Sequence, residues 1–513
     1  MKYLIGTDIG TSGTKTIIMD TQGNLISSDL QEYDVLTPRN LWAEQWPEVW
    51  VDAVKRSIRN AKNKTKCNPE DIKGICISGL YGGSGIPLDE NMNPVRPCLI
   101  WMDRRAEVEQ KWIENNIDLK RLYEISHNGT DPYYGYTKIL WIKNYEPENW
   151  AKTKLFLPPN AYVIYKLTGD IAIDYSSAGN IGGIFDQKKR AWSEEMMGAM
   201  GIPRSMMPER IVESSDIVGG LTSEAAKELG LQEGTPVCAG GVDCVVATLG
   251  LGVFEPGCYV AAIGTSMCAA LVHDHPINAK GLIEMPYVKD ASRLSYSFGG
   301  GATSGALLKW FRDNFARMEK LEEDQGGENA YQALDKAAAD IAPGSDGLIV
   351  LPYFMGERSP VWDVNARGNI FGLTLYHTSA HVYRAFLEAV AYSLRHSMES
   401  ANTELGDYIL VAGGVAKSKL WRQIIADVTG YPIVCPINDV EANLGDVILA
   451  GVGTGLLDYS KVKDWQVLGD KIMPNKKAHE IYSKYYKLYH SIYAHLKEDM
   501  EQIAELGKTK DQS

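Results

Sequence analysis

The 513-residue sequence has no apolar run of about 20 residues, the length that an α-helix needs to cross a bilayer. Its first residues, MKYLIGTDIGTSG, turn polar and glycine-rich after Ile5 and so lack the apolar core of a signal peptide. We therefore expect no membrane contact and a chain that stays in the cytoplasm.

The sequence also lacks the cysteine patterns of zinc sites and disulfide scaffolds. Its eight cysteines are spread from Cys67 to Cys435 without a C-x-x-C pair, and no histidines stand beside them at zinc-binding spacing. Free cysteine is among the most buried residue types. We interpret these cysteines as reduced and mostly buried.

Positive charge is scarce. Lys and Arg total 52 against 65 Asp and Glu, which gives a formal net charge of -13. Because affinity for a phosphate backbone comes from clustered Lys and Arg, nucleic acid is excluded as the main partner. The 45% hydrophobic and 23% charged residues are typical of a globular protein, and the length favours two sizeable lobes over one small core.

The tetrapeptide Ile-Gly-Thr-Ser occurs at 9–12 and again at 263–266, about half of the chain apart. Each copy lies between two apolar stretches, a pattern that predicts a strand, a tight turn and a second strand. We therefore interpret the two halves as duplicated α/β lobes, the first over residues 1–250 and the second over 251–513.

Further strands and helices are predicted to alternate in both halves. The strands lie at 72–78, 348–351 and 408–411, and the helices at 46–61 and 381–398. A last helix has tyrosines and aliphatic residues at three- and four-residue steps over 482–503, with Gly507 as its stop. We interpret its aromatic stripe as packing.

Four glycine-rich loops follow or contain apolar strand ends and could offer backbone N–H groups to an anion. They lie at 10–15, 264–266, 298–305 and 411–418. The first is not a P-loop, because G-x-x-x-x-G-K-[ST] does not occur there and a strand follows it. Any one of them alone fits an ordinary turn equally well. Together they suggest a nucleoside triphosphate held in a cleft between the lobes.

Two acidic residues stand beside these loops. Asp8 ends the strand before the first loop, and Asp243 follows two glycines where a helix over 244–251 is predicted. A carboxylate in either place could hold magnesium or accept a proton. Asp243 is equally placed to be a helix N-cap, so the local sequence leaves both roles open.

The most specific motif lies at 347–373 and contains Gly-Glu-Arg-Ser-Pro and Ala-Arg-Gly. With 368–388 and, less completely, 134–144, it resembles the FGGY carbohydrate kinases, within the actin, Hsp70 and hexokinase-like ATPases. The resemblance spans nearly the whole chain. It implies an α/β fold of two ribonuclease-H-like lobes with a cleft between them. It also implies phosphorylation of a sugar or polyol hydroxyl, with ATP and Mg²⁺ as cofactors.

The family pattern implies roles for single residues. Asp8 would hold Mg²⁺, and Asp243 would be the catalytic base beside the sugar. The positions expected to bind the nucleotide are Gly10, Thr11, Ser12, Lys15, Gly264, Thr265, Gly305, Lys309, Gly414 and Ser418. Lys15 is included because it is the cation of the first loop. The sugar positions are Tyr81, Gly82, Gly83, Trp101, Asp103 and Asp243. An alternative that stays open for Trp101 and Asp103 is strand-end packing with a surface salt bridge to Arg104 or Arg105.

The expected substrate is a ketopentose such as D-xylulose, because Gly-Glu-Arg-Ser-Pro and the segment 101–104 resemble the xylulokinase branch. The loop 78–85 matches neither the Met-His-Gly of xylulokinases nor the Arg-Glu of glycerol kinases. Alternatives are therefore another ketose, a polyol such as erythritol or a sugar acid such as gluconate. A different class is an actin- or Hsp70-like ATPase without a sugar substrate, which the run at 352–373 opposes. Family members are often dimers, so the resemblance implies a homodimer.

Overall fold

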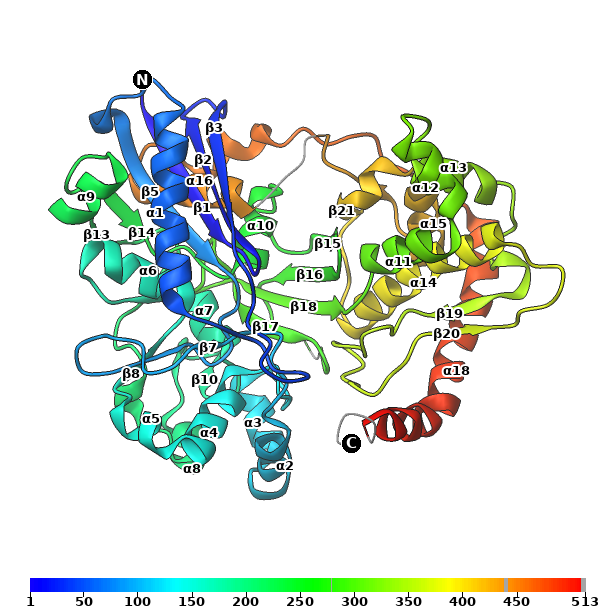
Figure 1. Cartoon of the computed structure of the whole chain (residues 1–513), viewed down its shortest axis with the longest axis horizontal. Helices are drawn as coiled ribbons and strands as arrows, with labels where there is room; N and C mark the ends of the chain where they lie inside the picture. The colour runs from blue at the N-terminus through cyan, green and yellow to red at the C-terminus, as the bar shows by residue number, and fades with distance from the viewer. Residues whose placement is uncertain (278, 438–441, 509–513) are drawn as a thin grey trace.

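The computed structural model describes residues 1–277, 279–437 and 442–508. These residues form two lobes, each built on a six-stranded sheet with helices packed against it (Figure 1). The expected α/β fold with two lobes is thereby confirmed. Among the described helices, none combines the length and the apolar character that crossing a membrane requires.

The sheet of the first lobe contains both strands of the first predicted hairpin. In spatial order its strands are β13 (Ile217–Gly220), β14 (Pro236–Cys238), β5 (Ile72–Gly79), β1 (Tyr3–Ile9), β2 (Gly13–Asp20) and β3 (Leu25–Glu32). The strands β1, β2 and β3 run antiparallel in turn, whereas β5 lies parallel to β1 and β14 parallel to β5. The strand, turn and strand expected around 9–12 are confirmed.

The second sheet repeats this arrangement. In spatial order its strands are β17 (Ile283–Pro286), β18 (Ser295–Gly301), β16 (Met267–His273), β15 (Tyr259–Ile263), β21 (Ile409–Gly413) and β22 (Ile433–Val434). Here β15, β16 and β18 run antiparallel in turn, and β21 and β22 are parallel to β15. The hairpin expected at 263–266 is therefore confirmed, and the shared topology supports a duplicated lobe.

The helices of the first lobe differ in how much of their surface is buried. The larger ones are α1 (Pro47–Asn63), α2 (Glu107–Asn116), α3 (Leu119–Ser126), α4 (Gly135–Tyr145), α6 (Pro159–Thr168) and α10 (Asp243–Gly250); shorter ones are α5 (Pro147–Lys152), α7 (Tyr175–Asn180), α8 (Glu194–Met200) and α9 (Ser223–Leu229). The helix α1 begins at Pro47, as expected from a proline in the first turn. It buries Trp50, Val54 and Ile58, four residues apart, against β2 and β3.

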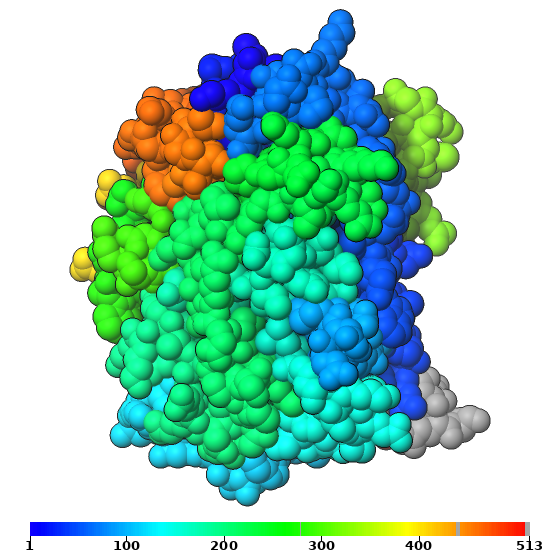
Figure 2. Space-filling model, turned by 90° about the vertical axis from the view of Figure 1, so that its left-hand side faces the viewer, coloured from blue at the N-terminus to red at the C-terminus, as the bar shows by residue number. Residues whose placement is uncertain are grey.

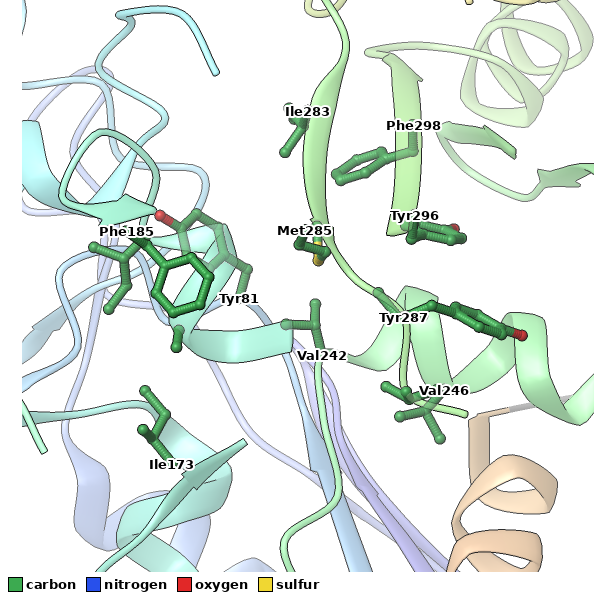
Figure 3. Close-up of a cluster of buried hydrophobic side chains, with 14 of the residues drawn as sticks. Tyr81, Ile173, Phe185, Val242, Val246, Ile283, Met285, Tyr287, Tyr296 and Phe298 are labelled. Atoms are coloured by element: carbon green, nitrogen blue, oxygen red, sulfur yellow. The ribbon is translucent and has the colours of Figure 1, made fainter. Parts of the chain in front are cut away.

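Four two-stranded pairs complete the first lobe. They are β4 (Glu44–Gln45) with β7 (Cys98–Leu99), β6 (Ile86–Leu88) with β8 (Leu155–Leu157), β9 (Ile173–Asp174) with β12 (Ile211–Val212), and β10 (Phe185–Asp186) with β11 (Ala191–Trp192). Figure 3 shows Phe185, Tyr81 and Val242 facing side chains of β17 and β18 in one apolar cluster. Since β17 also packs against α7, the two lobes meet along this edge of the second sheet.

The second lobe contains the expected helix over 381–398 and the long last helix. Its helices are α11 (Gly305–Phe315), α12 (Arg317–Asp324), α13 (Ala330–Ala338), α14 (Ser379–Ser400), α15 (Lys419–Thr429) and α18 (Lys476–Lys508), whereas the short α17 (Tyr459–Val462) contacts the preceding helix α16 (Ala442–Gly453). The strand predicted at 348–351 is β19 (Ile349–Leu351), which pairs with β20 (Asn369–Phe371) outside the six-stranded sheet. Tyr482 and Tyr489 of α18 are buried, so the aromatic stripe packs as expected. The helix continues through Gly507 to Lys508, the last described residue.

The helix α16 (Ala442–Gly453) comes from the second half of the chain but packs on the first sheet, against β1, β5 and α10. Figure 2 shows this orange part of the chain against the blue N-terminal surface. A Cβ atom at Gly6 would lie 2.3 Å from the carbonyl oxygen of Asn443, so the close approach requires glycine. The first lobe therefore contains residues from both halves of the chain. The boundary between two domains at residue 250 stays a prediction.

All eight cysteines are free thiols, and five of them are buried. The expectation that most of them are buried is thereby confirmed, and their reduced state stays a prediction.

Candidate active site

Three hollows lined by described residues contain most of the expected site residues. One of 910 Å³ lies in the second lobe, and one of 510 Å³ lies at the first hairpin. The third, of 170 Å³, shares Thr11, Asp243 and Cys244 with the second. Ser266 lines the third hollow, whereas its neighbours Gly264 and Thr265 line the first. The turn between β15 and β16 therefore separates the largest hollow from the smallest.

The 510 Å³ hollow gathers the expected residues of the first loop. Its lining includes Asp8, Gly10, Thr11, Ser12, Lys15 and Asp243. The turn is closed by the N–H of Gly10, which donates to the carbonyl oxygen of Gly13 at 2.9 Å. Because β1 and β2 pair directly, Asp8 stands opposite Lys15 in the register, and both strand ends open into the hollow. Asp8 and Asp243 thus meet in a shared space.

Asp243 is the first residue of α10 and not its N-cap. The N-cap position is Val242, and the side-chain Oδ1 of Asp243 accepts from the N–H of the adjacent Cys244 at 2.6 Å. Burial and the negative charge of Asp8 raise the pKa of Asp243 well above its usual range. The two carboxyl groups are therefore close enough for one to disfavour ionisation of the other. A raised pKa makes Asp243 a stronger base than an exposed carboxylate.

A third carboxyl group, of Asp446 in α16, lies behind Asp8. The hydroxyl of Ser78 donates to Asp446 Oδ2 at 2.8 Å, and Ser78 Oγ lies 3.2 Å from Asp8 Oδ1. Asp446 is buried, and its Oδ1 has no hydrogen-bond partner among the described residues. Burial and the charge of Asp8 raise the pKa of Asp446 well above its usual range. Ser78 therefore links Asp8 to the helix that crosses from the second half.

The 910 Å³ hollow is lined by all six expected nucleotide positions of the second half. They are Gly264, Thr265, Gly305, Lys309, Gly414 and Ser418. Gly305 begins α11, and its N–H donates to the carbonyl oxygen of Gly264 at 2.8 Å. A Cβ atom there would lie 2.6 Å from that oxygen, so this contact requires glycine. Ser418 is the N-cap of α15 and accepts from the N–H of Trp421 at 3.0 Å.

The third glycine-rich stretch differs from the expectation. Gly299, Gly300 and Gly301 belong to β18 and pair with β16, so they form a strand and not a loop. A Cβ atom at Gly299 would lie 2.2 Å from Ser397 Oγ of α14. Gly299 therefore allows α14 to pack closely on the sheet, whereas a Cβ atom at Gly300 would lie 3.1 Å from Arg358 Cζ. Gly305 is the residue of this stretch that reaches the hollow.

The 170 Å³ hollow is lined by polar groups from both lobes. Its lining includes Tyr81 and Trp101, as expected, together with Asp243. Trp101 Nε1 donates to Thr11 Oγ1 at 3.0 Å, and the Arg358 guanidinium lies 5.0 Å from the centre of the Trp101 ring. The indole is thus held between the first loop and a cation of the second lobe. An aromatic face with several donors and acceptors suits a small polyhydroxylated molecule.

The loop around Tyr81 is only partly placed as expected. The hydroxyl oxygen of Tyr81 accepts from the N–H of Gly135 at 2.5 Å, so its ring, rather than a free hydroxyl, faces the hollow. Gly82 and Gly83 line a separate space of 10 Å³ behind Tyr81. At Gly83, where φ is +51°, a Cβ atom would lie 2.0 Å from the Leu99 carbonyl oxygen. Both glycines therefore serve packing in this structure.

Asp103 does not reach the hollow. Its buried carboxylate accepts from the N–H of Ala43 at 2.7 Å and from the Arg105 guanidinium, whose Nη2 lies 2.7 Å away. A turn in which the N–H of Asp103 donates to the Ile100 carbonyl oxygen at 3.0 Å directs the chain away from the hollow. The geometry corresponds to the salt-bridge alternative, with the difference that the pair is buried.

Comparison with known proteins decides what class of protein has this geometry. Residues 3–250 match the N-terminal domain, and residues 259–454 the C-terminal domain, of the FGGY family of carbohydrate kinases. The chain belongs to this family. Membership makes the protein a carbohydrate kinase and implies ATP as its phosphoryl donor.

Several FGGY kinases are similar over nearly the whole chain. The xylulose kinase of Lactococcus lactis is 30% identical over 514 residues, which cover 99% of each chain. The gluconokinase of Bacillus subtilis is 33% identical over 470 residues, 90% of each chain. The ligand-bound crystal structure of xylulose kinase from Lactobacillus acidophilus has a TM-score of 0.90 and 26% identity, covering 98% of this chain and 100% of that one.

Several residues of this FGGY kinase site escaped the sequence analysis. Arg358 lies in the quoted Gly-Glu-Arg-Ser-Pro run, so a signal was present, although nothing in the run placed it beside Trp101. Asn443 and Asp446 come from a helix whose crossing into the first lobe has no local signature. Asn329 and Tyr331 line the 910 Å³ hollow from α13 and its N-cap, away from any glycine-rich loop.

Proposed function

We propose that this carbohydrate kinase transfers the terminal phosphoryl group of ATP to a hydroxyl of a ketopentose such as D-xylulose. The observation that carries the proposal is the position of Asp243, which lines both the 510 Å³ and the 170 Å³ hollows. One side chain thus faces both the space beside the first loop and the space beside Trp101. The similarity to xylulose kinases over nearly the whole chain supports the choice of sugar.

In this proposal Asp243 accepts the proton of the attacking hydroxyl. The base must be ionised and within reach of that hydroxyl when the phosphoryl group moves. Its raised pKa favours proton acceptance, and the N–H of Cys244 holds one carboxylate oxygen at 2.6 Å. The other oxygen can face a sugar in the smaller hollow. Trp101 and Tyr81 would pack against that sugar.

The nucleotide would lie across the two larger hollows. The adenine ring and the ribose of ATP suit the 910 Å³ hollow, which Trp310, Tyr331 and Trp421 help to line. The phosphates would extend past Gly264 and Thr265 towards the first loop, where Thr11, Ser12 and Lys15 offer donors and a cation. Phosphoryl transfer needs positioning and charge neutralisation, which backbone N–H groups and a lysine supply.

Magnesium fits the chemistry of the Asp8 side of the hollow. Among the described residues, no cluster of three or more His, Cys, Asp or Glu side chains could hold a metal by itself. Mg²⁺ is usually held by one or two carboxylates together with substrate phosphates, so Asp8 with a nucleotide suffices. The negative charges of Asp8 and Asp243 repel each other, and a bound cation would offset that repulsion. When bound, it would neutralise charge on the phosphates.

A sugar acid such as gluconate is the second candidate substrate. The specific observation is the guanidinium of Arg358, which lines the sugar-sized hollow and could pair with a carboxylate. The similarity to the gluconokinase of Bacillus subtilis supports this candidate.

The homodimer implied by the resemblance stays a prediction, which sedimentation velocity can test.

The experiment measures ADP release by the full chain with ATP, magnesium and one sugar at a time. The panel contains D-xylulose, other ketopentoses, erythritol and gluconate, and Asp243→Asn serves as the control. Stimulation by D-xylulose above all others supports the proposal, whereas stimulation by gluconate alone replaces it with the second candidate. ADP release that no sugar increases would favour an ATPase without a sugar substrate.

A further inference from the structure

Two cysteine side chains meet beside the proposed base. Cys244 follows Asp243 at the start of α10, and Cys268 is the second residue of β16, just after the second hairpin turn. The hydroxyl of Tyr296 lies 3.7 Å from Cys268 Sγ and 3.4 Å from the carbonyl oxygen of Cys244, so the two residues are neighbours although they belong to different elements. Both line the 170 Å³ hollow, so small molecules that enter it reach both thiols.

The surroundings favour the thiolate at Cys268. The side chain of Cys244 lowers the pKa of Cys268, and the hydroxyl of Tyr296 and the cation of Arg358 act in the same direction. Tyr296 lies on β18 with its hydroxyl 3.7 Å from Cys268 Sγ, and Figure 3 shows its ring near that of Tyr287. A thiolate next to a cation and hydrogen-bond donors is the reactive form of cysteine.

The other cysteines lack this combination of a partner and access. Cys76 and Cys238 face each other in neighbouring strands, but both are completely buried. Cys258 is partly exposed, but its thiol contacts the carbonyl oxygen of Tyr259 at 3.9 Å, and burial raises its pKa to about 11. The pair of Cys244 and Cys268 therefore differs from these in both reactivity and access.

We propose that Cys244 and Cys268 are a reversible redox pair whose disulfide closes the proposed sugar site. A hydroperoxide oxidises the Cys268 thiolate to a sulfenic acid, and the O–O bond breaks with release of the alcohol, or of water from hydrogen peroxide. The thiol of Cys244 then attacks that sulfur and expels water. Overall, two thiols and one hydrogen peroxide give one disulfide and two molecules of water, whereas an organic hydroperoxide gives one disulfide, one alcohol and one water. An external dithiol reverses the bond by thiol–disulfide exchange.

The disulfide would act on both the sugar space and the base. It would tie β16 of the second sheet to α10 and place a covalent bridge in the 170 Å³ hollow. Because the N–H of Cys244 donates to Asp243 Oδ1 at 2.6 Å, a shift of Cys244 also moves the carboxylate. The described lining of the 910 Å³ hollow contains neither cysteine. Cys244 also lines the 510 Å³ hollow, but ADP lacks the terminal phosphate that is proposed to lie beside Asp243, so ADP binding should persist. The loss of activity rests on the proposed function, but formation of the bond does not.

The test treats the full chain with hydrogen peroxide, alkylates the remaining thiols and identifies linked peptides by mass spectrometry. We expect a peptide pair joined through Cys244 and Cys268, its disappearance after dithiothreitol, and alkylation of the other six cysteines. A saturating sugar substrate should slow the reaction by occupying the hollow. Absence of the linked pair, or a stable sulfinic acid at Cys268 in its place, would overturn the proposal.

Variants separate the bond from its effect. The native chain should lose activity on oxidation and regain it on reduction. Cys268→Ser should keep the activity of its own untreated sample after the same oxidation. Cys258→Ser is the matched control and should remain as sensitive as the native chain. Nucleotide affinity, measured by calorimetry with ADP, should be the same in the reduced and oxidised forms. A disulfide that forms without loss of sugar phosphorylation refutes closure of the site, whereas inactivity towards every sugar before oxidation would refute the proposed function instead.

Discussion

The hydroxyl of Ser78 donates to Asp446 Oδ2 at 2.8 Å, and the two residues are 368 positions apart in the chain. This bond connects β5, in the centre of the first sheet, to the helix that crosses from the second half. Ser78 also lies 3.2 Å from Asp8 Oδ1. Ser78 Oγ therefore contacts both carboxyl groups, and Asp446 fixes the position of Ser78 beside the carboxylate that is proposed to hold magnesium.

Asp446→Ala should lower kcat about 10- to 100-fold, the usual effect of losing a residue that orients a metal ligand. Asp446→Asn keeps an acceptor for Ser78 and should lose much less. Sugar KM should stay the same in both variants, and the magnesium concentration for half-maximal rate should rise in the alanine variant. Steady-state kinetics over a magnesium series provide the measurement. Equal kinetics in Asp446→Ala and the native chain would refute this positioning role.

Asp243→Asn should lower kcat by roughly 10²–10⁴-fold, because a positioned base contributes about that factor. ADP should still bind, since Asp243 is not among the described residues that line the 910 Å³ hollow. Rate assays and calorimetry provide the two measurements. The exposed Glu90→Gln is the control and should match the native chain. Full activity of Asp243→Asn would remove this residue from the mechanism.

The rate should fall in acid at a pH above the usual range of a carboxyl group. Burial and Asp8 raise the pKa of Asp243, and the protonated form cannot accept the hydroxyl proton. As pH decreases through the raised pKa, kcat should therefore decrease, and Asp243→Asn should lack this dependence. Burial also raises the pKa of Glu357, next to Arg358, to about 7. An acid limb that disappears in Glu357→Gln would assign the dependence to Glu357.

Asp103→Asn should destabilise the fold without weakening sugar binding. Removing one charge of a buried pair leaves the Arg105 guanidinium short of a partner, which costs about 3 kcal/mol of unfolding free energy. Urea unfolding measures the loss, and sugar KM should stay unchanged. Glu195→Gln, which breaks an exposed ion pair with Arg121, should leave stability unchanged and serves as the control. A raised sugar KM with native stability would restore Asp103 to the sugar site.

Gly414→Ala should raise KM for ATP about tenfold, because a single methyl group in a ligand pocket has about that effect. A Cβ atom at Gly414 meets no atom within 4 Å, so the substitution fits the fold and projects into a lining position of the nucleotide hollow. Unfolding temperature and sugar KM should stay near native values. Gly129→Ala, also with open space around the added atom, is the control. An unchanged KM for ATP would place the nucleotide elsewhere.

The features that the sequence predicted well depend on neighbouring residues. Alternation of apolar strands and glycines predicted both hairpins, because turn chemistry acts over a few positions. Gly264, Gly305 and Gly414 then share one hollow, since the loops that carry them lie at the same end of the strands of the second sheet. The resemblance supplied their roles, which spacing alone did not.

The features that the sequence analysis missed depend on distant contacts. Gly299–Gly301 have the composition of a loop but form the end of β18, where the close approach of α14 leaves no room for a side chain at Gly299. Asp103 follows Trp101 closely, yet a turn buries it against Arg105. Asp446 reaches the site only because α16 crosses between the lobes. No local pattern distinguishes these outcomes from the alternatives.

The crossing of α16 also sets the order in which the protein can be completed during synthesis. The faces of β1 and β5 that α16 covers belong to the first 79 residues, but the covering helix ends at Gly453. On the ribosome, the lobe that emerges first keeps an apolar face exposed until nearly the whole polypeptide has emerged. The N-terminal lobe is thus translated first but completed only after most of the second lobe, to which α18 is added last.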